Sequence, residues 1–91
     1  MVRVVVLYPE EPPEERYAKH VELCRREVPE AAIRHGRVLG SPAGEPKYKR
    51  YFEFEFPDRD AWKRSQSGLM KTADDARELG VPFEVFFAEV E

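Results

Sequence analysis

Apolar and polar positions follow two different periods along the chain, and each change of period marks the boundary of an expected element. Val2–Tyr8 is rich in β-branched residues and almost continuously apolar, as is typical of a central strand buried on both faces. A proline-rich stretch ends this strand. Apolar side chains then recur at helical spacing between Tyr17 and Val28, so the pattern predicts a helix that begins at Glu14 and ends before Pro29.

Two further strands follow this helix. Ala32–Leu39 predicts a weaker strand, because charged residues and a glycine interrupt it, and a glycine- and proline-rich loop follows over 40–46. Tyr48–Phe56 alternates strictly between apolar and polar positions, which is typical of a half-buried strand. The alternation places Phe52, Phe54 and Phe56 on one face of this strand, and Tyr51, Glu53 and Glu55 on the other.

The last part of the chain predicts a helical region and a final strand. Apolar positions from Trp62 to Ala73 share one helical stripe, which Gly68 is expected to break or kink. A further helical segment is expected over 71–79, with a glycine directly after it at the position that favours the end of a helix. Phe83–Val90 is then the last strand.

Strand, helix and strand therefore occur twice, which predicts one α+β domain over residues 1–91 of the ferredoxin-like βαββαβ class. Right-handed crossovers in both halves give a four-stranded antiparallel sheet with the helices on one face. The helix-free face should be largely apolar, because strand Val2–Tyr8 is apolar on both sides. Since so short a chain buries only a small core, we expect a homodimer that pairs these faces, the alternative being a monomer with an exposed sheet.

Composition narrows the class of partner. The net charge is −3, and the 15 basic and 18 acidic residues are interspersed, so neither nucleic acid nor an anionic membrane is an expected partner. The single cysteine cannot form an intrachain disulfide, and no segment has the length or flanks of a membrane span or signal peptide, so we expect a cytoplasmic protein. A charged share of 36% and the absence of asparagine are typical of a thermophile.

One histidine is a candidate for chemistry. His20 lies at the edge of the first helical stripe, three residues after Tyr17 and four before Cys24. There it is expected to face a cleft between helix and sheet, where an imidazole can act as general acid or base with a tyrosine hydroxyl as its partner. The alternative is a structural histidine that bonds a backbone carbonyl or water. Tyr17 and Trp62 each combine an apolar ring with a polar atom, as residues of a pocket wall do.

Several short motifs together resemble one family. They are Leu7-Tyr8-Pro9 with a proline-rich loop, Tyr17-Ala18-Lys19-His20-Val21-Glu22-Leu23, the strand Tyr51–Phe56 followed by Asp60-Ala61-Trp62, and Ala73-Asp74-Asp75 before the last strand. In this order they resemble the EthD-like proteins of the dimeric α+β barrel superfamily. The resemblance implies a dimer whose two sheets face each other, with a cleft between sheet and helices in each subunit.

The resemblance also implies a range of functions. Members of the superfamily use such clefts for cofactor-independent oxygenation, isomerisation or dehydration, and we expect this chain to bind or act on a small apolar organic molecule. In an enzyme of this kind His20 is the expected proton-transfer residue, Tyr17, Tyr51 and Trp62 are expected to shape the pocket, and no cofactor is expected. No metal site is expected either, because the histidines and the cysteine lack ligand spacing.

Two other classes of function are open to this sequence. A non-catalytic ligand-binding or sensor subunit would need the same cleft, and the sequence does not separate it from an enzyme. An RNA-recognition motif shares the βαββαβ order and carries stacking aromatics on its third strand. That reading is disfavoured, because Lys49 stands where the first stacking aromatic belongs and both glycines of the signature are missing.

Overall fold

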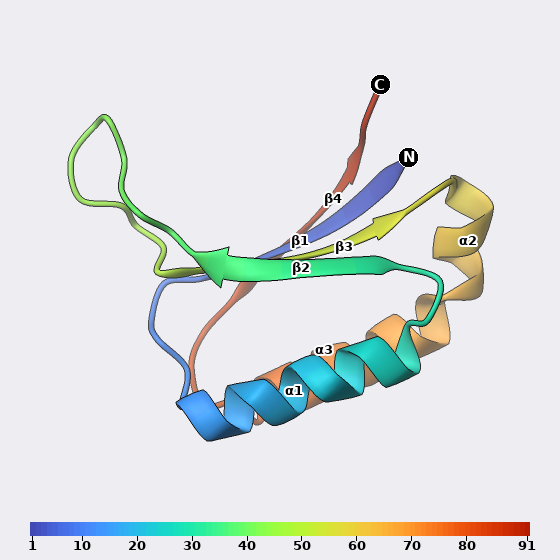
Figure 1. Ribbon diagram of the computed structural model, residues 1–91, viewed down its shortest axis with the longest axis horizontal. Coiled ribbons are helices and arrows are strands. Elements are labelled where there is room, and N and C mark those ends of the chain that lie inside the picture. Colours follow the sequence, from blue (N-terminus) through green and yellow to red (C-terminus); the bar gives the residue numbers. More distant parts are fainter.

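A four-stranded sheet with helices on one face organises the computed structural model, which describes residues 1–91 (Figure 1). The two long helices lie side by side in one layer, and a short helix at the end of the sheet leads into the second of them (Figure 1). In chain order the elements are β1 (Val2–Tyr8), α1 (Glu14–Glu27), β2 (Ala32–Arg37), β3 (Arg50–Phe56), α2 (Arg59–Arg64), α3 (Gln66–Arg77) and β4 (Glu84–Glu89). None of the helices is long and apolar enough to cross a membrane.

The sheet has the strand order β2-β3-β1-β4, and every neighbouring pair is antiparallel. The register of the central pair sets Val4 opposite Phe54 and Val6 opposite Phe52. Backbone pairing continues beyond the strands, where Val90 N donates to Met1 O at 2.9 Å. The expected ferredoxin-like α+β fold is therefore confirmed.

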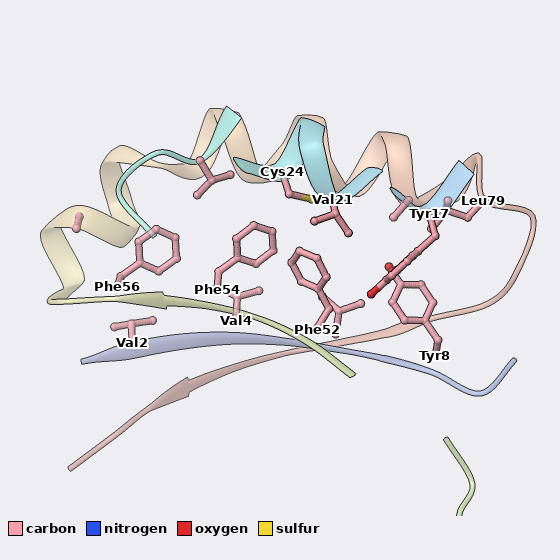
Figure 2. Close-up of a cluster of buried hydrophobic side chains, with 14 residues drawn as sticks. Val2, Val4, Tyr8, Tyr17, Val21, Cys24, Phe52, Phe54, Phe56 and Leu79 are labelled. Atoms are coloured by element: carbon pink, nitrogen blue, oxygen red, sulfur yellow. The ribbon is translucent and has the colours of Figure 1, made fainter. Parts of the chain in front are cut away.

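Strict alternation along β1 and β3 builds the core. The even-numbered residues of β1 and the three phenylalanines of β3 point toward the helices, where Tyr17 and Cys24 of α1 meet them (Figure 2). Full burial of such a valine or phenylalanine side chain contributes about 1.5 to 3 kcal/mol. The core comprises Val2, Val4, Val6, Tyr8, Tyr17, Val21, Cys24, Val28, Phe52, Phe54, Phe56, Ala61, Ala76 and Leu79.

The break in the second helical region lies at Ser65, and the prediction of a break at Gly68 is wrong. Ser65 ends α2, where its hydroxyl donates to Ala61 O at 2.8 Å. Gly68 lies inside α3, at the point where this helix meets the carboxyl end of α1. A Cβ there would stand 2.0 Å from the carbonyl oxygen of Glu27, so the glycine serves close helix packing instead.

The helix-free face of the sheet is mixed, so the prediction of a largely apolar face is also wrong. Arg34 of the edge strand reaches Glu53 at 3.0 Å and Glu55 at 2.7 Å, while Arg3 of β1 pairs with Glu55. The Tyr51 hydroxyl donates to the Glu53 carboxylate. These ion pairs connect three strands, and apolar side chains of Val5, Leu7 and Phe86 occupy the part of the face nearer to β4.

Candidate functional site

A cavity of about 170 Å³ lies between the sheet and α3. Twelve of its fifteen lining residues are hydrophobic, so its wall suits an apolar ligand. The wall comprises Val4, Val6 and Tyr8 of β1, His20 of α1, Phe52 and Phe54 of β3, Gln66, Leu69, Met70, Thr72, Ala73 and Ala76 of α3, and Phe83, Val85 and Phe87 at β4.

The cavity has an open and a closed end. Met70 and Phe87 are the most exposed of the large apolar lining residues, at 68% and 64%, so the opening lies between α3 and the edge strand β4. The buried part of the wall, called the closed end from here on, comprises Val4, Val6, Tyr8, His20, Phe52, Phe54, Thr72 and Ala76. Figure 2 shows the Tyr8 ring at one end of the core beside Tyr17, with Phe52 nearer the middle.

His20 is held at the closed end by a carboxylate. Its Nδ1 lies 2.8 Å from Oδ2 of Asp75 on α3, and the imidazole is only 3% exposed. An ionised carboxylate accepts hydrogen bonds and does not donate them, so Nδ1 carries a proton, and in a neutral imidazole Nε2 is then the acceptor. This contact orients the ring, and Nε2 lies 3.5 Å from the Cys24 thiol.

Asp75 is itself held by an arginine. Arg16 donates to Asp75 Oδ1 at 2.5 Å and to Oδ2 at 3.1 Å. The Arg16 guanidinium, and secondarily His20, holds the pKa of the Asp75 carboxyl below its usual value. The carboxylate therefore stays charged at neutral pH, and the Arg16-Asp75-His20 chain joins α1 to α3 beside the cavity.

Cys24 completes an arrangement that looks like a nucleophilic triad but lacks the properties of one. Its Sγ lies 3.5 Å from His20 Nε2, yet the residue is fully buried and does not line the cavity. Burial raises the pKa of the Cys24 thiol to about 12, whereas a reactive cysteine has a lowered pKa. Cys24 is a core residue with a weak contact to the imidazole.

Two phenol groups in the core beside the cavity have no hydrogen-bond partner in the protein. The hydroxyls of Tyr8 and Tyr17 are both buried and unpaired. Their rings meet edge to face with centroids 5.8 Å apart, one rising from β1 and the other reaching down from α1 (Figure 2). Burial raises the pKa of both hydroxyls, that of Tyr17 to about 12, so both remain protonated.

No protein-family model matches this chain, and a comparison with curated protein sequences finds no match. Solved structures do match it. An ethyl tert-butyl ether D (EthD) family protein from Bacillus halodurans superposes with a TM-score of 0.76 and 20% identity, covering 100% of this chain and 99% of that one. The chain has an EthD-like fold.

Other solved structures share this EthD-like fold. A dimeric ferredoxin-like protein of unknown function from Thermobifida fusca matches with a TM-score of 0.64 and 11% identity, over 98% of this chain and 90% of that one. SnoaB, a cofactor-independent oxygenase from Streptomyces nogalater, matches with a TM-score of 0.57 and 19% identity over the same shares. At these identities the likeness concerns the fold alone.

Only part of the predicted site lies together. His20 lines the cavity, and Tyr17 packs directly behind the wall, with its ring centroid 5.8 Å from that of Tyr8 and 6.4 Å from that of His20. Tyr51 does not line the cavity, because alternation along β3 places it on the helix-free face. Trp62 does not line it either: α2 places it at a separate hollow, against Phe87 at 5.6 Å between ring centroids.

The orientation of the β3 aromatics also bears on the RNA-binding alternative. An RNA-recognition motif stacks bases on aromatic side chains of the helix-free face. Here Phe52, Phe54 and Phe56 point toward the helices, and the helix-free face of β3 carries Glu53 and Glu55. Of the β3 aromatics only Tyr51 lies on that face, and its hydroxyl is bonded to Glu53.

The sequence interpretation missed Asp75, Arg16 and Tyr8 as members of the site. Asp75 and His20 are 55 positions apart, so no local spacing connects them. The available signal was the position of Asp75 next to Ala76 and three residues after Thr72, on the buried side of α3. Tyr8 belongs to the Leu7-Tyr8-Pro9 motif, and there the apolar pattern predicts only the end of a strand.

Proposed function

We propose that this chain binds a small apolar organic molecule in the cavity and that His20 transfers a proton to or from it without a cofactor. The observation that carries this proposal is a buried imidazole, oriented by Asp75, in the wall of an otherwise apolar cavity. A cavity of this size accommodates a ligand of one or two rings. The likeness in fold to a cofactor-independent oxygenase agrees with such chemistry.

Proton transfer at a buried base is tested with a ketone that exchanges hydrogen. 2-Tetralone in deuterated water takes up deuterium next to its carbonyl, and NMR follows the rate. We expect the wild-type protein to accelerate this exchange and His20→Gln to abolish the acceleration, because the amide cannot act as a base near neutral pH. Circular dichroism checks that the variant is folded.

A second pair of variants tests whether the reaction takes place in the cavity. Val85→Trp fills the cavity from β4, whereas Val90→Trp adds the same bulk at a comparably exposed valine outside it. We expect exchange to be lost in Val85→Trp and kept in Val90→Trp. No acceleration by the wild-type protein, together with saturable binding of p-xylene, would contradict proton transfer and leave a ligand-binding protein.

We also infer that the molecule is a homodimer through the helix-free face of the sheet. Phe86 is 49% exposed there and lies beside Val5 of β1. A structurally similar protein from Thermobifida fusca is described as dimeric. The charged residues on the face are already paired within the subunit, which lowers the free-energy cost of covering them.

A further inference from the structure

We propose that Tyr8 selects the ligand of this cavity by donating a hydrogen bond to an oxygen atom, so that the preferred ligand is a ring compound with a phenol or ketone group. This inference rests on the proposed function, since it concerns the ligand of the same cavity. It adds a chemical class to that ligand and a specificity-determining residue to the site.

The first support is an unpaired, enclosed polar group on a residue of the cavity wall. Tyr8 is fully buried and lines the cavity, and its hydroxyl has no partner in the protein. A buried hydroxyl without a hydrogen bond destabilises the folded state, so such groups are uncommon and call for an explanation. Gln66 and Thr72 of the same wall are satisfied, because they donate to backbone carbonyls of Trp62 and Leu69.

The second support is the fixed position of the Tyr8 ring. The ring packs against Tyr17 at 5.8 Å and against Phe83 at 6.1 Å between centroids. Figure 2 shows it standing up from β1 into the layer between sheet and helices. A hydroxyl held in this way is preorganised, because little side-chain freedom is lost when it donates to a ligand.

The third support is the chemistry of the neighbouring groups. Burial raises the pKa of the Tyr8 hydroxyl, so this group stays protonated and can donate, whereas Nε2 of a neutral His20 is an acceptor, with the Cys24 thiol 3.5 Å away. Both residues line the closed end of the cavity. A ketone whose oxygen accepts from Tyr8 can give the proton of its adjacent carbon to Nε2. The C–H electron pair then forms the enolate, whose oxygen Tyr8 stabilises, and the proton returns from the imidazolium to carbon.

Tyr17 does not fill the same role, although its hydroxyl is also unpaired. It is not among the residues that line the cavity, and the Arg50 guanidinium covers its ring at 5.2 Å from the centroid. The structure therefore assigns ligand contact to Tyr8 and support of the Tyr8 ring to Tyr17.

Two probes of equal size separate the hydrogen bond from apolar burial. p-Cresol and p-xylene differ by a hydroxyl in place of a methyl group, and calorimetry or protein NMR gives the dissociation constant of each. The measured quantity is the ratio of the p-xylene to the p-cresol dissociation constant. We expect Tyr8→Phe to lower this ratio about tenfold, the effect of one hydrogen bond, while p-xylene binds the variant at least as well as the wild type.

Tyr48→Phe is the matched control. It removes the same atom from a tyrosine outside the cavity, whose hydroxyl donates to Glu84, and should leave the ratio unchanged. If both probes bind and Tyr8→Phe leaves the ratio at its wild-type value, this inference is wrong and the proposed function stands. If neither probe binds the wild-type protein, the proposed function fails and this inference fails with it.

Discussion

Asp75 is the residue on which the geometry of the candidate site depends. Its carboxylate accepts from Arg16 and from His20, so one side chain both neutralises a cation and sets the tautomer of the imidazole. Because both partners come from α1, the same contacts also hold α1 and α3 together. A substitution at Asp75 should therefore change proton transfer and stability at the same time. The pH dependence of stability then tests the contribution of the Asp75 charge.

We expect Asp75→Asn to lower the free energy of unfolding by about 1.5 to 3 kcal/mol at pH 7, the range for hydrogen bonds to a charged group. The pKa of Asp75 is lowered in the folded protein, chiefly by Arg16, whereas in the unfolded chain it is about 4. The stability that comes from this charge is therefore complete above pH 4 and is lost as the pH falls through the folded-state pKa. The difference in the free energy of unfolding between the wild type and Asp75→Asn should therefore become smaller as the pH falls.

The neighbouring aspartate provides the control for this titration. Asp74 is exposed and pairs with Arg77 on the same helix, so Asp74→Asn should change the melting temperature little at any pH. Thermal denaturation of both variants between pH 2 and pH 7 makes the comparison. A constant gap for Asp75→Asn across this range would show that its charge does not stabilise the fold.

At the scale of elements, the contact between α1 and α3 at Gly68 leaves no room for a side chain. Glycine inside a helix normally destabilises it by about 1 kcal/mol relative to alanine, so a favourable effect of alanine is the default expectation. Here the added methyl group would meet the backbone of Glu27 at 2.0 Å, and a backbone atom cannot move aside as a flexible side chain can. The two helices would have to separate.

Gly68→Ala should therefore lower the free energy of unfolding by about 1 to 3 kcal/mol, the usual effect of overpacking. Gly36→Ala is the matched control, because Gly36 lies in β2 with no atom within 4 Å of an added Cβ. That substitution should be neutral or slightly stabilising, since alanine loses less backbone entropy than glycine on folding. Chemical denaturation of both variants gives the two values, and equal stability of Gly68→Ala and wild type would contradict the steric argument.

The elements that the sequence predicted well are those whose residues follow one regular pattern of burial along most of their length. β1 is buried in the centre of the sheet and β3 alternates between core and helix-free face, so their patterns are strong, and β1 was predicted with its observed bounds. The helix break was misplaced because Ser65 ends α2 through a hydrogen bond to Ala61, whereas Gly68 is present for a contact with a distant helix. Such a contact leaves no local pattern.

The site was predictable to the extent that helical spacing determines it. Helical spacing and the family resemblance predicted that His20 faces a cleft, and His20 lines the cavity. Alternation along β3 already indicated that Tyr51 faces away from it. The Asp75 contact and the unpaired Tyr8 hydroxyl depend on how separate elements pack. Periodicity assigns a residue to a face, but it does not determine which residue of another element lies opposite.

At the scale of the whole molecule, the two faces of β4 have different surroundings. Phe86 and Phe87 are consecutive and both exposed, at 49% and 64%, yet they point to opposite sides of the sheet. Phe86 lies opposite Val5 on the helix-free face, whereas Phe87 lies opposite Val4 on the helix side and lines the cavity. A pair of identical substitutions can therefore distinguish an interface on the helix-free face from one on the helix side.

We expect the wild-type protein to sediment as a dimer at micromolar concentration and Phe86→Glu to weaken the dimer at least about tenfold. The substitution removes a large apolar contact and places an unpaired carboxylate in the covered face, where the cations Arg3 and Arg34 are already paired with Glu53 and Glu55.

Phe87→Glu makes the same change on the helix side and should leave the mass of the assembly unchanged. Sedimentation equilibrium of all three proteins measures this directly, with circular dichroism to confirm folding. A monomeric wild-type protein at tens of micromolar, or dissociation by Phe87→Glu and not by Phe86→Glu, would show that the helix-free face is not the interface.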